Sequence, residues 1–321
     1  MFWLFFIALL LLLIIVIYNL IPFAENKVLF FPSKKDHWCP EIDYEEVYIN
    51  VKNPSVVYRK GVPKKSECDR RHNYIHGWYF NRFPGHKTVL YFHGNSGNIS
   101  NRSYIVDICE KFELNLFIFD YRGFGKSSGN PSKVGLRQDS EAAYHFGRNT
   151  CEIAPDNIVT WGESLGGAAA IWVASKYPCR SLILLSTFSG LDDAARYYCD
   201  PGIKQTLVNG CTQLCALRFD MLPSRDYIKK VKCPVVIMHS KDDDIIPYTC
   251  AKILYDNVSH KSKILITIKG AHSAPEITKE QLRKLFMFCD ISLSKYEKRH
   301  DIEEMLDEIR TVAARHHNFI D

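Results

Sequence analysis

The chain has 321 residues, of which 46 % are hydrophobic, enough for one large domain with a substantial core. Lysine and arginine (41) exceed aspartate and glutamate (36) by only five, and no dense basic block is present, which argues against a nucleic-acid-binding protein. The 11 cysteines are scattered without a C-x-x-C pair, which argues against a zinc site and favours reduced thiols. A disulfide among Cys199, Cys211 and Cys215 stays open if the domain faces an oxidising compartment.

Residues 1–22 are uncharged and almost wholly apolar. A helix needs about 20 apolar residues to cross the hydrocarbon core, and Trp3 and Tyr18 lie near the two ends, where aromatic side chains meet the interface. We therefore predict a retained single-pass membrane anchor that contacts lipid. The alternative is a signal peptide cleaved near Ala24, although the stretch has no basic n-region. Lysines follow the span and none precedes it, so the positive-inside rule predicts a cytosol-facing domain.

The main domain is expected between residues 28 and 290, with short strands at its N-terminal, antiparallel edge and polar residues 53–73 as a loop. From residue 88 onward, continuous apolar runs alternate with helical segments, which is typical of a mostly parallel sheet covered by helices on both faces. The predicted strands are 28–32, 46–51, 74–80, 88–92, 114–119, 158–161, 182–185, 235–238 and 264–268, and the predicted helices are 103–112, 132–147, 165–176, 248–255 and 275–288.

Two segments depart from this alternation. Residues 190–224 interrupt it, and we interpret them as a small helical cap over the carboxyl ends of the strands, which could line an acyl pocket; a plain surface excursion is the alternative. Residues 293–321 form a charged tail in which apolar residues recur at helical spacing, which predicts an amphipathic surface helix.

The most informative motif is Gly162-Glu163-Ser164-Leu165-Gly166, between a predicted strand and a predicted helix. It fits the G-x-S-x-G nucleophile elbow, in which a strained turn exposes the serine hydroxyl at the top of a sheet. The glycines avoid collisions with the adjacent strand and helix, and the helix N-terminus supplies partial positive charge near a developing oxyanion. The alternative is an ordinary glycine-rich turn. We therefore predict Ser164 as a catalytic nucleophile.

A serine hydroxyl needs an adjacent base, and in this arrangement the acid and the histidine follow the serine in that order along the chain. His272 follows the last predicted strand and is the candidate base; the alternative is a solvent-exposed loop histidine. Three adjacent aspartates follow the preceding strand, and Asp243 is the candidate acid, with Asp242 and Asp244 as direct rivals. One of the three could instead cap the helix that starts near Pro247.

The loop that starts at His93 follows the first buried strand, where a second oxyanion donor is expected. We predict an oxyanion hole formed by the backbone N–H groups of Asn95 and Leu165, with Gly94 allowing close approach of the substrate and His93 orienting the loop. The later glycine-rich loop, residues 120–129, lacks nucleotide-binding spacing. For Asp120 and Arg122 in that loop we expect structural hydrogen bonds to neighbouring loops.

The motifs HGNSGN, DYRGFGKSSG, GESLGG, HSKDDDIIP and GAHS occur in this order and resemble those of the α/β-hydrolase superfamily. Within it, the chain resembles the membrane-anchored α/β-hydrolase domain-containing proteins of types 13 and 17. The resemblance implies the α/β-hydrolase fold and, through the family's H-G-x-x-D pattern, the acid at Asp243. Type 13 members share the single N-terminal span, and type 17 members are protein depalmitoylases. The chain differs in carrying Ser240 and the sequence Ala271-His272-Ser273 where the family usually has Gly and Gly/Thr-His-Asn.

Together these features predict a membrane-anchored serine hydrolase of acyl esters or thioesters, with Ser164, Asp243 and His272 as its catalytic triad and no metal or organic cofactor. The substrate would be a lipid or an S-acylated protein. Two alternatives stay open: a serine peptidase of the same fold, and a non-catalytic binding protein that keeps the fold.

Overall fold

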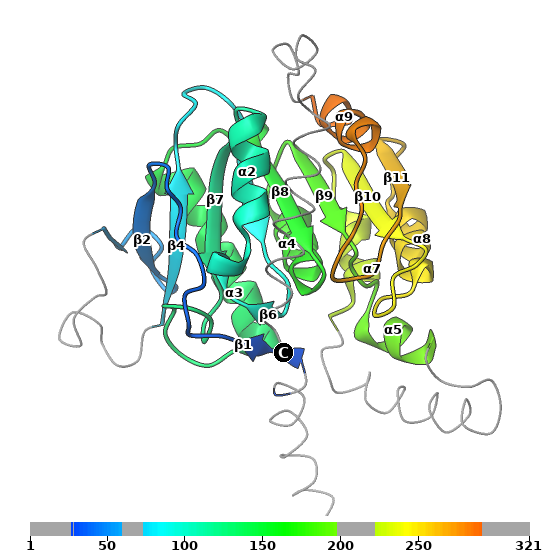
Figure 1. Ribbon diagram of the computed structural model, residues 1–321, viewed down its shortest axis with the longest axis horizontal. Coiled ribbons are helices and arrows are strands. Elements are labelled where there is room, and N and C mark those ends of the chain that lie inside the picture. The colour runs from blue at the N-terminus through cyan, green and yellow to red at the C-terminus, as the bar shows by residue number, and fades with distance from the viewer. Residues whose placement is uncertain (1–26, 28, 60–72, 198–221, 291–321) are drawn as a thin grey trace, which may run out of the picture.

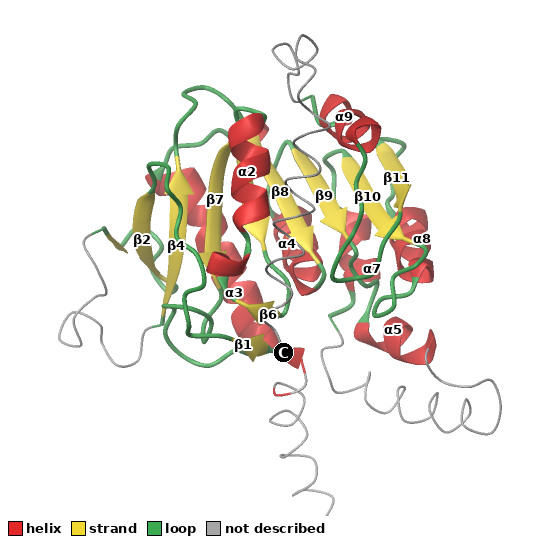
Figure 2. Ribbon diagram, in the orientation of Figure 1, coloured by secondary structure: helices red, strands yellow, loops and turns green. Residues whose placement is uncertain are grey.

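The computed structural model describes residues 27, 29–59, 73–197 and 222–290 (Figure 1). Its centre is a nine-stranded sheet with the strand order β11-β10-β9-β8-β5-β7-β4-β2-β3 (Figure 2). The parallel part comprises β5 (Thr88–Phe92), β7 (Asn115–Asp120), β8 (Ile158–Glu163), β9 (Ser181–Leu185), β10 (Val235–Ser240) and β11 (Lys263–Ile268).

The antiparallel edge consists of β4 (Tyr74–Phe80), β2 (Glu45–Asn50) and β3 (Val57–Tyr58), as the sequence predicts for the first two. The prediction of an unbroken loop over residues 53–73 is wrong, because Val57 and Tyr58 pair with β2 to form a short hairpin. A separate pair joins β1 (Phe31–Pro32) to β6 (Ser96–Gly97) in parallel.

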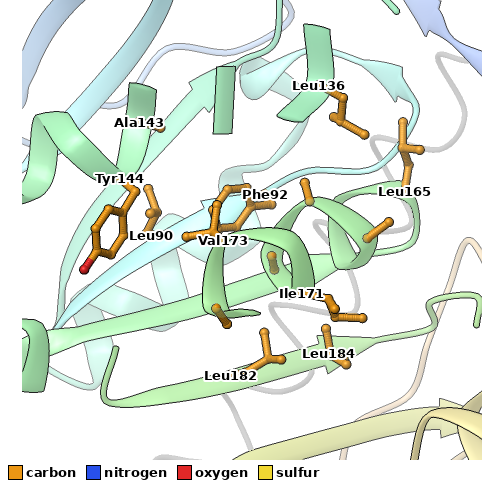
Figure 3. Close-up of a cluster of buried hydrophobic side chains, with 14 of the residues drawn as sticks. Leu90, Phe92, Leu136, Ala143, Tyr144, Leu165, Ile171, Val173, Leu182 and Leu184 are labelled. Carbon is orange, nitrogen blue, oxygen red and sulfur yellow. The ribbon is translucent and has the colours of Figure 1, made fainter. Parts of the chain in front are cut away.

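Helices cover both faces of the sheet. In Figure 1, α2 (Ser103–Lys111) and α9 (Lys279–Phe288) lie in front, while α3 (Lys133–His145), α4 (Leu165–Lys176) and α8 (Tyr248–Asn257) lie behind. Successive side chains of a strand point to opposite faces of the sheet, and helices cover both faces, so the central strands are buried on both sides. In β5, Leu90 and Phe92 enter the core under α3 and α4 (Figure 3), while Val89 and Tyr91 enter the core under α2. The predicted mostly parallel α/β architecture is confirmed.

The last helix begins at Lys279, four residues after the predicted start. Thr278 and Gln281 form a capping box at its N-terminus, and the preceding residues are held by a bridge between Glu276 and Lys269. A side-chain cap therefore decides this boundary, and the apolar pattern does not reveal it.

Several predictions fall on residues outside the described ranges: the anchor over residues 1–22, most of the cap over residues 190–224, the tail over residues 293–321, and the cysteines 199, 211 and 215. Of the cap region, the structure describes α5 (Leu191–Tyr197) and α7 (Ser224–Tyr227). Among the described residues, no helix combines the length and apolar character needed to span a membrane.

Candidate active site

Ser164 lies at the sharp turn between β8 and α4, at the carboxyl edge of the sheet. Its backbone has φ 53° and ψ −118°, a conformation that non-glycine residues rarely adopt and that costs about 1–3 kcal/mol. The surrounding structure holds this turn: the Ser164 N–H donates to the carbonyl of Leu185 (2.9 Å), and the Thr187 hydroxyl donates to the Ser164 carbonyl (2.6 Å). The geometry is that of a nucleophile elbow.

The glycines of the motif are required because a side chain at these positions would clash with neighbouring atoms. A Cβ on Gly162 would lie 2.4 Å from the carbonyl oxygen of Gly166, and a Cβ on Gly166 would lie 1.9 Å from the carbonyl oxygen of Phe92. A Cβ on Gly167 would meet the Thr187 side chain at 2.2 Å. Because the first two obstacles are backbone atoms, no side-chain rotation can relieve them. The turn therefore brings the start of α4 directly against the ends of β5 and β8.

His272 and Asp243 reach Ser164 from two different loops. The Ser164 Oγ lies 3.0 Å from Nε2 of His272, and Nδ1 of His272 lies 2.9 Å and 3.1 Å from the two carboxylate oxygens of Asp243. The loops follow β11 and β10, respectively, so that the parallel sheet aligns their carboxyl ends with that of β8. The structure thus brings the three predicted residues into one hydrogen-bonded chain.

The three adjacent aspartates have distinct partners. Asp243 also accepts hydrogen bonds from the N–H groups of Ile245 (3.0 Å) and Ile246 (2.7 Å). Asp244 accepts from the backbone N–H of His272 (3.0 Å), so it holds the histidine loop and not the imidazole. The backbone N–H of Asp242 donates to Ser240. None of the three caps α8, whose N-cap residue Pro247 has no side-chain hydrogen bond, so that expectation is wrong.

His239 lies on the other side of Asp243, and the sequence analysis assigned it no role. Its side chain is fully buried, with Nε2 2.8 Å from the carbonyl oxygen of Ile246 and 3.3 Å from a carboxylate oxygen of Asp243. Burial opposes ionisation of Asp243, but hydrogen bonds from His239, His272 and Ile246 outweigh it and hold the pKa of Asp243 well below its usual range. The carboxylate is therefore charged and available to orient His272.

The two predicted oxyanion donors lie in segments next to Ser164. Gly94 lies beside Ser164, because a Cβ built on it would be 3.6 Å from the Ser164 Cβ. The carbonyl of Asn95 accepts from the Phe31 N–H (2.8 Å), which fixes the loop. Within the described part of the chain, the N–H groups of Asn95 and Leu165 donate to no protein acceptor. Both are therefore free to donate to a substrate oxygen, as an oxyanion hole requires.

The polar residues His93, Asp120 and Arg122 of the neighbouring loops make structural contacts. Burial lowers the pKa of His93 to about 4, so its imidazole is neutral, and its Nδ1 lies 2.7 Å from the Gly94 carbonyl oxygen. Asp120 accepts from the Ile99 N–H (2.9 Å), which ties two neighbouring loops together as expected. Arg122 instead pairs with Asp139 on α3. His93 is thus positioned to shape the loop, and its burial excludes it as a solvent-accessible base.

A buried polar cluster beneath the elbow is absent from the sequence predictions. The Glu163 carboxylate accepts hydrogen bonds from the hydroxyls of Tyr91 and Tyr104, and it lies 3.7 Å from Nε of Arg102. Burial raises the pKa of both phenols far above the usual value, so they remain donors. Burial opposes ionisation of Glu163, but Arg102 and the two hydroxyls lower its pKa overall. In the sequence, Tyr91 and Glu163 are visible as polar residues within apolar strand segments. That they contact each other follows only from the pairing of β5 with β8 in the sheet.

Arg102 links this cluster to the loop that carries Asn95. Its side chain donates to the carbonyls of Ser96 (3.0 Å) and Asn101 (3.3 Å), and the residue is only 9 % exposed. The guanidinium therefore joins Glu163, next to the nucleophile, to the loop that carries Asn95. This partly buried ion pair thus connects the two backbone segments that carry the proposed oxyanion donors.

Replacing Arg102 by methionine should lower the free energy of unfolding by about 3 kcal/mol, because it leaves the Glu163 charge buried without its cation. This value is at the lower end of the usual range because the Glu163 side chain keeps 23 % exposure. Urea denaturation at neutral pH measures the change. Arg82→Met is the matched control, since its ion pair with Glu110 is about one-third exposed and should contribute less than about 1 kcal/mol. Equal losses in the two variants would contradict the assignment.

Comparisons with known proteins agree with the observed fold. Residues 87–220 match the family model of the alpha/beta hydrolase fold. The chain is 30 % identical over 207 residues to the uncharacterized protein YfhR of Escherichia coli O157:H7, an alignment that covers 62 % of this chain and 69 % of the relative. The chain belongs to the α/β-hydrolase superfamily. It is also similar to α/β-hydrolase domain-containing protein 17C: 32 % identical over 217 residues to the Xenopus tropicalis protein and 30 % over 212 residues to the human protein.

The alignments with the type 17C relatives cover 65 % and 64 % of this chain and 64 % and 59 % of the relatives from Xenopus tropicalis and human, so the chain spans less than two thirds of their length. Among solved structures, the esterase Pf2001 of Pyrococcus furiosus has a TM-score of 0.56 at 17 % identity, covering 89 % of this chain and 97 % of the esterase. An alpha-beta hydrolase from Vibrio vulnificus has a TM-score of 0.52 at 18 % identity, covering 76 % and 79 %. At this identity the structural likeness shows the shared fold.

Proposed function

We propose that the protein is a membrane-anchored serine hydrolase that cleaves carboxylic ester or thioester bonds of acyl substrates. The observation that carries the proposal is the hydrogen-bonded chain from Ser164 through His272 to Asp243 at a nucleophile elbow. Membership of the α/β-hydrolase superfamily supports hydrolase chemistry. The apolar stretch at residues 1–22 supports the anchor, because its length suits a membrane span.

In the proposed reaction, the Ser164 Oγ attacks the acyl carbonyl carbon while Nε2 of His272 takes the hydroxyl proton. The N–H groups of Asn95 and Leu165 stabilise the oxyanion, helped by the N-terminus of α4. His272 then gives the proton to the departing alcohol or thiol, leaving an acyl-enzyme on Ser164. Water, deprotonated by His272, then attacks the acyl carbon; as the bond to Ser164 Oγ breaks, His272 returns the proton to Oγ, releasing the carboxylic acid and regenerating the serine hydroxyl. Throughout, Asp243 holds Nδ1 in its protonated form.

Substrate profiling of the detergent-solubilised full chain tests this proposal. We expect hydrolysis of p-nitrophenyl esters and of acyl thioesters, with retained activity toward long acyl chains, and covalent labelling of Ser164 by a fluorophosphonate probe. Cleavage of peptide amides at rates matching those of esters would favour the serine peptidase instead. Labelling at no residue, together with no turnover of any ester, would favour a non-catalytic binding protein.

A further inference from the structure

We infer that the carboxyl edge of the parallel sheet, where Ser164 lies, docks onto a lipid bilayer, so that acyl substrates reach the site directly from the membrane. This inference rests on the membrane anchor of the proposed function. It adds the orientation of the domain relative to the bilayer and the route by which the substrate enters the site. Its first support is the position of the segment that follows the apolar stretch. In Figure 1, β1 lies beside β6, at the end of the sheet toward which the parallel strands run.

The segment around β1 is bound to the proposed oxyanion loop by its backbone. The Phe31 N–H donates to the carbonyl of Asn95 (2.8 Å), and the Ser33 N–H donates to the carbonyl of Gly97 (3.0 Å). The Asn98 side chain donates to the carbonyls of Ser33 (3.2 Å) and Lys35 (2.8 Å). The segment from Phe31 to Lys35 therefore lies against the loop that carries Asn95, beside the candidate site.

The same segment is also fixed to the next loop along the edge. The Gly125 N–H donates to the carbonyl of Ser33 (2.9 Å), and the Lys34 ammonium donates to the carbonyl of Ser127 (2.8 Å). Phe30 is 4 % exposed and packs edge-on against Phe124, with ring centroids 6.4 Å apart. These contacts fix β1 against the domain. A membrane anchor that precedes β1 would therefore hold the candidate site close to the bilayer.

Chain length then limits how far the site can be from the membrane. Eight residues lie between residue 22, at the end of the apolar stretch, and Phe31, so nine Cα–Cα steps join the two positions. Even fully extended, these nine steps span at most about 32 Å, because each step adds no more than about 3.6 Å. A domain of roughly 260 residues has a radius of gyration of about 18 Å, and hence a greater width than this reach. The β1 edge is therefore the part of the domain held nearest the bilayer.

Exposed apolar side chains gather on this edge. Of the five large hydrophobic residues most exposed in the described part of the chain, four follow the carboxyl end of the sheet: Phe31, Val56, Val134 and Ile245. Phe31 is 53 % exposed, on the strand that binds Asn95, and Ile245 is 55 % exposed, in the loop that carries Asp243. The fifth, Met287, is 62 % exposed on α9, at the opposite end of the molecule in Figure 1. Isolated exposed hydrophobic residues are ordinary, but their concentration beside the anchored edge fits insertion into lipid.

Full-length protein reconstituted in phosphatidylcholine vesicles tests the docking without depending on catalysis. A tryptophan placed on the edge by Phe31→Trp should be quenched by brominated lipid, after subtraction of the wild-type signal. The matched variant Met287→Trp should show less than a fifth of that quenching. Equal quenching at the two positions, or none at Phe31→Trp, would overturn the inference even if the protein hydrolyses esters.

A second measurement addresses the substrate route. The rate with a long-chain thioester embedded in the vesicles is divided by each variant's own rate with soluble p-nitrophenyl acetate. We expect this ratio to fall at least tenfold in the Phe31→Glu, Ile245→Glu double variant and to change less than twofold in Met287→Glu. An unchanged ratio in the double variant would refute entry from the membrane. If no ester is cleaved while the quenching persists, the proposed function fails and the docking stands.

Discussion

Replacing Ser164 by alanine should lower kcat for ester hydrolysis by about 10⁶-fold, because the acyl-enzyme can no longer form. Stopped assays with p-nitrophenyl butyrate, together with fluorophosphonate labelling, measure the loss. The fold should survive, because the strained turn is held by backbone contacts that alanine keeps: the N–H bond to Leu185 and the carbonyl bond from Thr187.

The matched control for this variant is Ser175→Ala, in the last turns of α4. The Ser175 hydroxyl donates only to the carbonyl of Trp172 (2.7 Å), within the same helix. We expect kcat within about twofold of wild type for Ser175→Ala. Substantial residual labelling or turnover in Ser164→Ala would assign the nucleophile to another residue.

Replacing Asp243 by asparagine should lower kcat about 10⁴-fold while preserving the shape of the site. An amide N–H₂ group can donate to Nδ1 of His272, and this favours the tautomer in which Nε2 carries the proton and cannot act as a base. Because the pKa of Asp243 is held well below its usual range, the carboxylate stays ionised at any pH used in assays. The loss should therefore persist across the whole neutral and mildly acidic range, as pH–rate profiles of the two proteins would show.

The neighbouring aspartates provide controls that differ only in position. Asp242→Asn should leave kcat nearly unchanged, because only its backbone takes part in the contact with Ser240. Asp244→Asn should lower kcat by no more than about tenfold, because the asparagine Oδ1 can still accept the hydrogen bond that the Asp244 carboxylate accepts from the backbone N–H of His272 (3.0 Å). A larger loss in either variant than in Asp243→Asn would identify a different acid.

Local patterns in the sequence were sufficient to predict the architecture. Continuous apolar runs alternating with helical segments predict a parallel sheet, because helices cover both faces of such a sheet and the side chains on both faces of its strands are therefore apolar. The elbow could also be predicted, since its glycines and serine are adjacent in the chain and the required backbone conformation is local. The helix start at Lys279 and the strand at Val57 were missed, because a side-chain cap and a hairpin partner decide them.

Other features depend on residues that meet only in the folded chain. Sequence spacing leaves Asp242, Asp243 and Asp244 equivalent, and the loop geometry alone determines which carboxylate faces His272. The cluster of Glu163, Tyr91 and Arg102 requires the pairing of β5 with β8 and the packing of α2, and neither can be predicted from residues adjacent in the sequence.

By itself, the sequence determined the class of fold, the elbow and the chain order of serine, acid and histidine, because these depend on short-range patterns and on how parallel strands align their ends. Only the tertiary structure decided which aspartate meets the imidazole, which buried charges support the oxyanion loop, and that β1 is joined to that loop. These depend on distances between segments remote in the chain, which hydrogen bonding and close packing set once the sheet has formed.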